Sequence, residues 1–310
     1  MKLAFLFPGQ GSQKKGMLHY LPKHPVVDEV TQQASTLLNK SVYDLDSKEA
    51  LTSTLSVQLS LLVSSVAVSK LLESEGITPN FVAGHSVGAF SAAVAAKAID
   101  FPDALKLVKL RGELMEKAYP ASYGMGVITG LSGKEIKKII DSYFTKEVPV
   151  YMANLNSPCQ TTISGSIIGI KKILHFAKEH GAKRADILNV KVPSHSPLLQ
   201  SVSTTLYEAL RQVHFHPPVI PYSCNRTARL LRSAGDIRDD LAFSPSYPVM
   251  WHDATSLLYE HGTRLFIEMN PGNVLTKLAR KAFPQARAVS VEEDGLENTT
   301  VLAQRFFEQR

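Results

Sequence analysis

The stretch Gly84-His85-Ser86-Val87-Gly88 constrains this chain more than any other, because it sets a serine between two glycines at a predicted strand-to-helix turn. A short apolar run at residues 81–83 leads into it, and the alanine-rich segment that follows favours a helix. In such a turn the glycines let neighbouring backbone pass close by, and the serine hydroxyl stands clear of the sheet. Ser86 is therefore the first candidate nucleophile, with a Gly/Ser-rich turn of no chemical role as the alternative.

Length and composition place the chain among ordinary globular proteins. A chain of 310 residues can form one large α/β domain that carries a smaller one, and its 44% hydrophobic and 20% charged content is typical of that class. No uninterrupted apolar run reaches the roughly eighteen residues of a membrane span, and the apolar N-terminus is too short for a signal peptide. Cys159 and Cys224 fit neither a disulfide framework nor a metal site, so we expect a cytoplasmic protein with free thiols.

The net charge of +6 suggests a partner that is acidic. The basic residues form no dense run of the kind that binds nucleic acid. The loop at residues 8–13 also lacks the glycine spacing of a dinucleotide-binding turn and the Gly-Lys-Ser/Thr ending of a phosphate-binding loop. We therefore expect no nucleic acid, no membrane and no bound cofactor.

Strands and helices are predicted to alternate, which is typical of an α/β fold with a parallel sheet. Strands are expected at residues 2–7, 81–83, 218–224, 264–269 and 288–291, and helices at 26–39, 47–75, 104–119, 197–212, 252–261 and 273–283. The stretch between residues 224 and 252 is polar and is interpreted as turns.

Residues 124–192 follow a different order. Strands are expected at 124–131, 148–154, 159–164 and 185–192, and helices at 133–143 and 167–180. This βαββαβ order is that of the ferredoxin-like split unit. We therefore predict a small ferredoxin-like domain at residues 124–192, inserted into a large α/β-hydrolase-like domain of residues 1–123 and 193–310.

Two polar residues lie within apolar stretches of predicted helices. Arg111 lies among the apolar positions of helix 104–119, where a guanidinium group is costly unless an anion meets it. A structural ion pair with a buried Asp or Glu and a bidentate clamp for a substrate carboxylate are both open. Gln58 interrupts the apolar run 57–72, so it must be paired or must face a cavity.

His195 stands where the predicted small domain returns to the large one. Pro197 suits the first position of the helix that follows, so His195 lies near a helix N-terminus. That position disfavours the imidazolium ion and keeps a neutral base available. His195 is therefore the candidate general base for Ser86, with a purely structural histidine as the alternative.

Six motifs, in the same order and along nearly the whole chain, resemble those of malonyl-CoA:acyl-carrier-protein transacylases. They are Phe-Pro-Gly-Gln-Gly-Ser-Gln (7–13), Gly-His-Ser-Val-Gly (84–88), Leu-Arg-Gly (110–112), Asn-Ser-Pro (156–158), Val-Pro-Ser-His (192–195) and Asn-Pro-Gly-Asn-Val-Leu (270–275). The resemblance implies an acyl-carrier-protein S-malonyltransferase that works by a ping-pong acyl-enzyme route. Its substrates would be malonyl-CoA and the phosphopantetheine-type thiol of an acidic acyl carrier protein, and no metal or bound cofactor would take part.

The resemblance also implies roles for single residues. Ser86 would be the nucleophile and His195 its base, and Arg111 would bind the free carboxylate of the malonyl group. The backbone N–H groups of Gln10 and Val87 would form the oxyanion hole.

Three further residues would support the site by the same resemblance. In this family a backbone carbonyl in the Pro-Val-x-Trp segment orients the histidine, here in residues 248–251, and we assign that role to the carbonyl of Met250. Relatives often have Gln where Met250 stands, a change that a backbone role tolerates. Gln58 and Asn156 are expected as supporting residues.

The sequence departs from the family at position 89. The family usually has Glu after Gly-His-Ser-x-Gly, whereas this chain has Ala89 followed by Phe90. These residues, with segments 118–124 and 153–156, are more similar to the epsilon subunit of biotin-independent malonate decarboxylase. The main hypothesis is therefore that the chain charges the carrier subunit of that complex, with other decarboxylase subunits as further partners. A malonyl-CoA:acyl-carrier-protein transacylase of fatty-acid synthesis is the alternative.

The residues leave two other classes of function open. A serine hydrolase of the α/β-hydrolase kind would have the order Ser, acid, His, and Asp186 lies between Ser86 and His195, although on the last strand of the inserted unit. A non-catalytic subunit of a multi-enzyme complex would account for the loss of Glu at position 89. It would not account for the presence of Ser86, His195 and Arg111 together.

Overall fold

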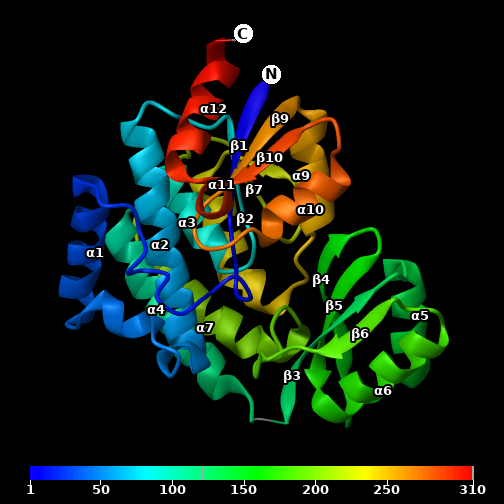
Figure 1. Cartoon of the computed structure of the whole chain (residues 1–310). Coiled ribbons are helices and arrows are strands. Elements are labelled where there is room, and N and C mark those ends of the chain that lie inside the picture. The colour runs from blue at the N-terminus through cyan, green and yellow to red at the C-terminus, as the bar shows by residue number, and fades with distance from the viewer. Residues whose placement is uncertain (121, 309–310) are drawn as a thin grey trace.

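Two β-sheets organise the computed structural model, which describes residues 1–120 and 122–308 (Figure 1). The larger sheet has the strand order β10-β9-β1-β2-β7-β8, and its pairs are parallel except β7–β8 at one edge. Its strands are β1 (Lys2–Phe7), β2 (Phe81–Gly84), β7 (Tyr222–Ser223), β8 (Leu230–Leu231), β9 (Thr263–Glu268) and β10 (Arg287–Ser290). The predicted parallel-sheet core is confirmed.

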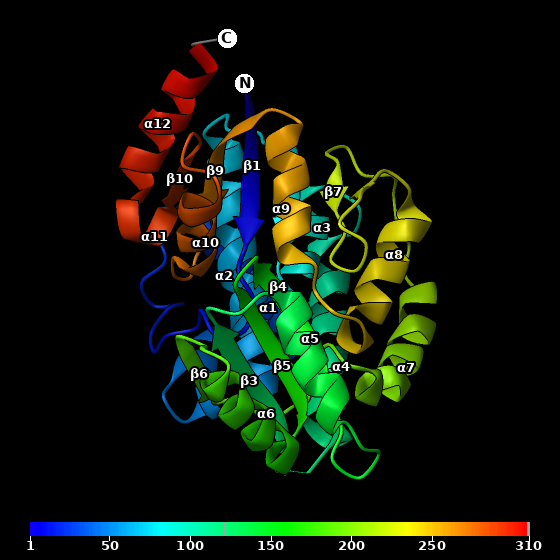
Figure 2. The same cartoon turned by 90° about the vertical axis from the view of Figure 1, so that its right-hand side faces the viewer.

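Helices cover both faces of the larger sheet, and alternate residues of β1 reach the two layers because successive strand side chains point to opposite faces. Leu3, Phe5 and Phe7 are buried against the first layer, and Ala4 and Leu6 against the second. The first layer comprises α1 (Pro25–Leu38), α2 (Thr54–Ser74), α3 (Gly88–Ala95), α4 (Phe101–Ala118), α7 (Gln200–Arg211), α8 (Ala234–Phe243) and α12 (Leu296–Glu308), and the second α9 (Trp251–Glu260) and α10 (Val274–Ala282). Figure 1 shows α2 and α10 on opposite sides of β1, and in Figure 2 α2 lies behind the strand. A single turn, α11 (Val291–Asp294), leads from β10 into α12.

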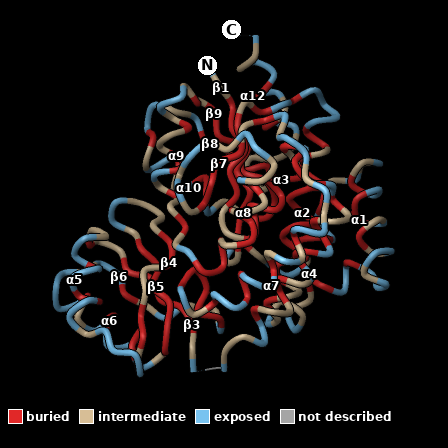
Figure 3. The backbone as a smooth tube through the Cα atoms, turned by 180° about the vertical axis from the view of Figure 1, so that it is seen from behind, coloured by how far each residue is buried: buried red, intermediate tan, exposed pale blue. Residues whose placement is uncertain are grey.

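Helix α2 forms the centre of the first layer. It is long and apolar enough to pass for a membrane-spanning helix, but 83% of its most apolar window is buried inside the protein. Figure 3 shows it buried along much of its length, as a helix that is apolar on all sides must be in a core. It begins at Thr54 rather than at residue 47, because Ser53 caps it by accepting a hydrogen bond from the Ser56 N–H at 3.2 Å.

The smaller sheet is antiparallel, with the strand order β4-β5-β3-β6. Its elements follow the predicted βαββαβ order: β3 (Tyr123–Thr129), α5 (Gly133–Tyr143), β4 (Val150–Ser157), β5 (Gln160–Ser166), α6 (Ile167–Glu179) and β6 (Arg184–Ile187). Helices α5 and α6 pack on it through a separate apolar core that includes Ile128, Ile136 and Ile173. Strand β6 is shorter than predicted, since the chain leaves the sheet after Ile187 and runs toward His195.

A short backbone pairing joins the smaller sheet to the segment before α9. The Leu155 N–H donates to the carbonyl of Val249 at 2.8 Å, and the Val249 N–H donates to that of Ala153 at 2.8 Å. Strand β4 is therefore fixed to the segment that precedes α9. The face between the sheets, beside the carboxyl ends of β1 and β2, is where the candidate site lies.

Three further parts of the fold differ from the prediction. Helix α8 lies in the stretch that was interpreted as turns, and helix α12 follows the last predicted strand. The strand predicted at 218–224 shrinks to Tyr222–Ser223, because Pro217, Pro218 and Pro221 have no N–H groups to offer a neighbouring strand.

Candidate active site

Ser86 occupies a tight turn between β2 and α3, as predicted. Its backbone is left-handed, with φ of 56°, which a side chain adopts only where its surroundings enforce it. Glycine is required on both sides. A Cβ atom at Gly84 would lie 2.1 Å from the carbonyl oxygen of Gly88, and one at Gly88 would lie 2.2 Å from that of Phe7. The two glycines therefore allow α3 to begin directly against the ends of β1 and β2.

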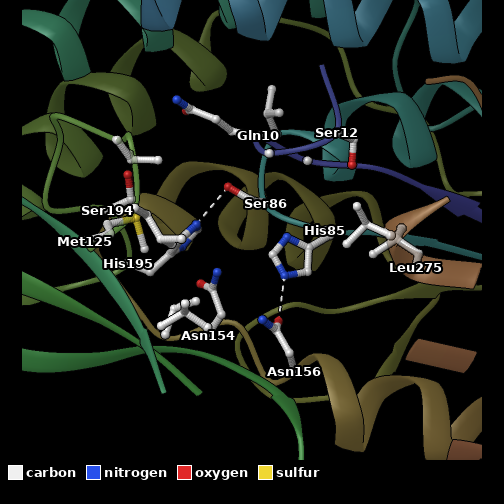
Figure 4. A pocket seen from close by; sticks show the side chains of 18 of the residues that line it. Gln10, Ser12, His85, Ser86, Met125, Asn154, Asn156, Ser194, His195 and Leu275 are labelled. Carbon is white, nitrogen blue, oxygen red and sulfur yellow. Dashed lines mark hydrogen bonds between the residues drawn. The ribbon is translucent and has the colours of Figure 1, made fainter. Parts of the chain in front are cut away.

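His195 is hydrogen-bonded to Ser86, 109 residues away in the chain. The Ser86 hydroxyl lies 2.7 Å from His195 Nε2 (Figure 4). On the other side of the ring, His195 Nδ1 lies 2.8 Å from the carbonyl oxygen of Ser244. Because a carbonyl oxygen only accepts, Nδ1 carries the proton and Nε2 is left to accept from the serine. The pair has the geometry of a nucleophile and its general base.

The carbonyl that orients His195 belongs to Ser244 and not, as predicted, to Met250. Met250 directly precedes α9, so its carbonyl points into the helix and accepts from the Ala254 N–H at 2.9 Å. Ser244 starts a short 3-10 helix, Ser244–Ser246, and the following carbonyl, that of Pro245, accepts from the His195 N–H at 2.8 Å. This short helix therefore holds both the backbone and the ring of His195.

Burial keeps His195 neutral. Loss of hydration lowers its pKa to about 3, and the nearby positive charge of Arg111 acts in the same direction. The sequence predicted a neutral base but for a different reason, the N-terminus of the next helix. That helix, α7, begins only at Gln200, five residues later.

Arg111 projects from α4 into the same site and is only 1% exposed. Its Nη1 donates to Gln58 Oε1 at 2.6 Å and its Nη2 donates to Ser86 Oγ at 3.3 Å. Its Nε has no hydrogen-bond partner among the residues that the structure describes. Burial lowers its pKa to about 10, so it is still a cation at neutral pH. Within the described residues it forms no ion pair with a carboxylate, which is evidence against the structural ion pair that the sequence left open.

Gln58 turns its amide toward Arg111. Its Nε2 lies 3.5 Å from the sulfur of Met115, and its Oε1 accepts from Arg111. The polar interruption of the apolar helix α2 is thus paired, as its burial requires.

Asn156 contacts His85 rather than Ser86. Its Oδ1 lies 3.0 Å from His85 Nε2, and the His85 ring packs edge-on against Trp251 with ring centroids 5.3 Å apart (Figure 4). Burial lowers the pKa of His85, and the hydrogen bond to Asn156 opposes that effect. Since Asn156 lies on β4, it ties the smaller sheet to the turn that holds Ser86.

Gln10, in the loop after β1, and Val87, which directly precedes α3, line the same cavity as Ser86. In the part of the chain that the structure describes, neither backbone N–H has a hydrogen-bond partner. Both donors are therefore free to bind an oxygen atom of a ligand beside Ser86, as an oxyanion hole requires.

These groups line a cavity of about 350 Å³. Its walls come from the loop after β1, from α2 and α4, from the smaller sheet and from α10, and they include Met125, Asn154, Leu275 and Ser194 (Figure 4). Among residues 1–120 and 122–308, no group of three or more His, Cys, Asp or Glu is placed to hold a metal ion.

Asp186, weighed as the acid of a hydrolase triad, lies elsewhere. Its carboxylate pairs with Arg184 at 2.7 Å on β6, the edge strand of the smaller sheet. His195 Nδ1 is already hydrogen-bonded to the Ser244 carbonyl, so Asp186 does not orient His195 as the acid of an α/β-hydrolase triad would.

Sequence reasoning missed Asn225, which contacts the Ser86 turn directly. Its Oδ1 accepts from the Ser86 N–H at 3.0 Å. It lies in the stretch interpreted as turns, next to a strand of two residues, and no local pattern marks it. Only the folded pairing of β7 with β2 brings it to Ser86.

A family model and the sequences of known proteins both match this chain over almost its whole length. The chain matches the acyl transferase domain family over residues 4–301. It is 37% identical over 298 residues to the malonyl CoA-acyl carrier protein transacylase of Bacillus subtilis, and the match covers 94% of each chain.

Solved structures are similar over almost the whole chain. The malonyl CoA-acyl carrier protein transacylase of Coxiella burnetii superposes with a TM-score of 0.93 at 35% identity, covering 98% of both chains. A malonyl-transacylase solved in complex with a type II PKS acyl-carrier protein gives a TM-score of 0.91 at 33% identity, covering 98% of this chain and 99% of that one.

Proposed function

Because the chain belongs to the malonyl-CoA:acyl-carrier-protein transacylase family, we propose that it moves a malonyl group from malonyl-CoA to the thiol of an acyl carrier protein. The proposal rests mainly on the position of Arg111. This buried cation has no carboxylate partner among the described residues, and its Nη2 lies 3.3 Å from the Ser86 hydroxyl. A buried guanidinium is stable only when an anion or several acceptors satisfy it. The malonyl carboxylate is the anion that a malonyl thioester would bring there.

Ser86 acts as the nucleophile in the first half-reaction. His195 Nε2 takes the hydroxyl proton while Ser86 Oγ attacks the thioester carbonyl of malonyl-CoA. The N–H groups of Gln10 and Val87 stabilise the oxyanion, each donor being worth about 3–4 kcal/mol by precedent. The C–S bond then breaks, the sulfur takes the proton from His195, and CoA leaves a malonyl ester on Ser86.

The second half-reaction uses the same groups in the reverse direction. The thiol of the carrier gives its proton to His195 and attacks the ester carbonyl, and Ser86 Oγ leaves and recovers the proton. The carbonyl of Ser244 keeps Nδ1 protonated in both steps, so Nε2 is always the atom that exchanges the proton. The residues proposed here need no bound cofactor or metal.

Arg111 selects the acyl group. A planar guanidinium can bind a carboxylate through two hydrogen bonds, and Gln58 holds Arg111 in place through Nη1. An acetyl group offers no carboxylate and leaves the buried cation unpaired, so it reacts poorly.

Replacing Arg111 tests this proposal. In Arg111→Ala we expect kcat/KM for malonyl-CoA to fall by at least about 100-fold, because the carboxylate loses its partner. Acetyl transfer, measured with acetyl-CoA on the same preparation, is the internal control and should not fall. An equal loss for both acyl groups would refute the carboxylate clamp.

The identity of the carrier separates two candidates. The similarity to acyl-carrier-protein transacylases supports transfer to a general acyl carrier protein. Ala89 and Phe90, buried in α3 where the family has Glu at position 89, favour the carrier subunit of malonate decarboxylase as a second candidate. The candidates differ only in the acceptor, so incubating the malonyl-enzyme with each purified carrier, and measuring which one removes the malonyl group faster, decides between them.

A further inference from the structure

The side-chain amide of Asn225 bridges two backbone groups on either side of His85. Its Nδ2 donates to the carbonyl of Gly84 at 2.9 Å, and its Oδ1 accepts from the Ser86 N–H at 3.0 Å. Asn225 is 3% exposed, so water does not compete for either bond. The reactive turn is therefore held from the side of β7.

This pair of bonds continues the ladder of the larger sheet. Strands β2 and β7 are parallel, with Val82 opposite Tyr222 and Ala83 opposite Ser223, and β7 then ends. In a parallel pair, one residue donates to a carbonyl of the neighbouring strand and accepts from the N–H two residues further on. Gly84 and Ser86 have that spacing, so the amide of Asn225 takes the place of the next peptide group.

The turn at Ser86 explains why a side-chain amide, and not a further peptide group of β7, forms these bonds. Beyond Gly84 the chain must leave the sheet, and Ser86 has a φ of 56° that is unfavourable for a residue with a side chain. The half-buried Ser86 N–H still needs an acceptor after β7 has ended. A side chain satisfies the N–H without adding a strand.

Asp240 of α8 fixes Asn225 in turn. This carboxylate is fully buried and accepts from the Asn225 N–H at 3.1 Å. It also accepts hydrogen bonds from Tyr222, Cys224 and Arg226. One buried carboxylate therefore binds β7 and the residues that follow it. On the other side, the Asn225 carbonyl accepts from the Met250 N–H at 2.7 Å.

We infer that Asn225 is a positioning residue for malonyl transfer, held by Asp240, which keeps Ser86 Oγ in line with His195 Nε2. The inference rests on the proposed function, in which Ser86 is the nucleophile. Asn225 touches no reacting atom, so its loss slows the attack by Ser86 and leaves the affinity for malonyl-CoA unchanged.

Two substitutions test it. Asn225→Ala removes both bonds, whereas Asn225→Asp keeps an acceptor for the Ser86 N–H and places a second oxygen against the Gly84 carbonyl. In rapid-quench intact-mass experiments we expect the rate of malonyl-Ser86 formation to fall by about 10- to 100-fold in both, because a displacement of roughly 1 Å at a reacting atom can cost 100-fold. The dissociation constant for malonyl-CoA, measured by calorimetry in a Ser86→Ala background, should stay within about twofold with and without Asn225→Ala, as expected of a residue that acts through geometry.

Asn80 provides the matched control. It lies at the other end of β2, and its Oδ1 accepts a backbone bond from the Leu3 N–H at 2.9 Å. Asn80→Ala should lower the melting temperature and leave the rate of malonyl-Ser86 formation within about twofold, because it is far from the turn.

The outcomes separate this inference from the proposed function. If the unmodified protein forms no malonyl adduct, the proposed function fails. If it does, and the Asn225 variants form the adduct at the same rate or lose only affinity, the positioning role is overturned. Failure of both Asn225 variants to fold would assign the residue to stability and would overturn the positioning role as well.

Discussion

Arg111 is held in the cavity by an amide and a hydroxyl, although its charge calls for an anion. Ser86 and His195 would serve many acyl transfers, since they supply only a nucleophile and a base. What distinguishes this site is that a cation is buried 3.3 Å from the nucleophile. At the scale of single residues, we therefore propose that Arg111 selects the substrate and that Ser86 and His195 carry out the chemistry.

The low pKa of His195 gives a prediction for the pH profile. A free histidine gains its proton near pH 6.5, whereas the pKa of His195 is lowered to about 3, so its neutral, proton-accepting form persists to lower pH. We expect the kcat/KM for malonyl-CoA to be flat between about pH 8 and pH 5, where a free histidine would already be protonated. Circular dichroism at each pH checks that the protein stays folded. A loss of activity with a midpoint at an ordinary histidine pKa would contradict this account.

How much of the site could be predicted depends on how local each signal is. The turn at Ser86 was predicted because five consecutive residues, 84–88, form its motif. The burial of Arg111 was predicted because its own helix has apolar residues on the same face. Ser244 and Asn225 act on His195 and Ser86 from 49 and 139 residues away. No pattern in their own neighbourhoods shows those contacts, since they exist only after the sheets have formed.

At the scale of elements, regular helices and strands were predicted from the sequence, and the helices α8 and α12 were not. The helices α4 and α6 were predicted well because their apolar residues recur at helical spacing. The strands β1 and β9 were predicted well because each contains a short continuous apolar run. Helix α8 was missed because its three aspartates and one arginine made the stretch look polar, although Ile237 and Leu241 lie four residues apart. One of those aspartates, Asp240, is in fact buried and binds Asn225 after β7. Helix α12 was also not predicted, because the last element expected from the sequence was the strand at residues 288–291.

Gly88 gives a prediction at this scale. In Gly88→Ala the new Cβ would lie 2.2 Å from the carbonyl of Phe7, so α3 must move away from β1 and carry Ser86 with it. We expect a destabilisation of about 1–3 kcal/mol by chemical denaturation, with loss of malonyl-Ser86 formation.

Gly235, in the first turn of α8, is the control for Gly88. The nearest atoms to a Cβ there lie 3.9 Å away, so Gly235→Ala should be neutral or slightly stabilising and should leave the activity intact. If Gly88→Ala were tolerated as well as Gly235→Ala, the close contact would not be a requirement of the site.

At the scale of the whole molecule, the site lies where the larger and smaller sheets meet. Strand β4 is bonded to the segment before α9, and Asn156 of that strand contacts His85 beside the nucleophile. The smaller sheet is therefore one wall of the cavity as well as a separate structural unit.

The net charge of +6 gives a prediction for the encounter with the carrier. An acidic carrier is attracted by the surface charge, and salt screens this attraction because the screening length falls from about 14 Å to about 4 Å between roughly 0.05 and 0.5 M salt. We expect kcat/KM for the carrier in the second half-reaction to fall over that range. Free pantetheine, a neutral thiol, should discharge the malonyl-enzyme equally well throughout. An equal response of both acceptors would rule out charge-assisted docking.

The central claim is that Ser86 carries the malonyl group between the two substrates. The measurement that tests it most directly is the intact mass of the protein after mixing with malonyl-CoA, in parallel with Ser86→Ala. We expect the mass to rise by one malonyl group, no rise in Ser86→Ala, and return to the original mass when a carrier is added. Steady release of CoA without an adduct that a carrier can remove would mean hydrolysis, and an adduct that persists in Ser86→Ala would place the nucleophile elsewhere.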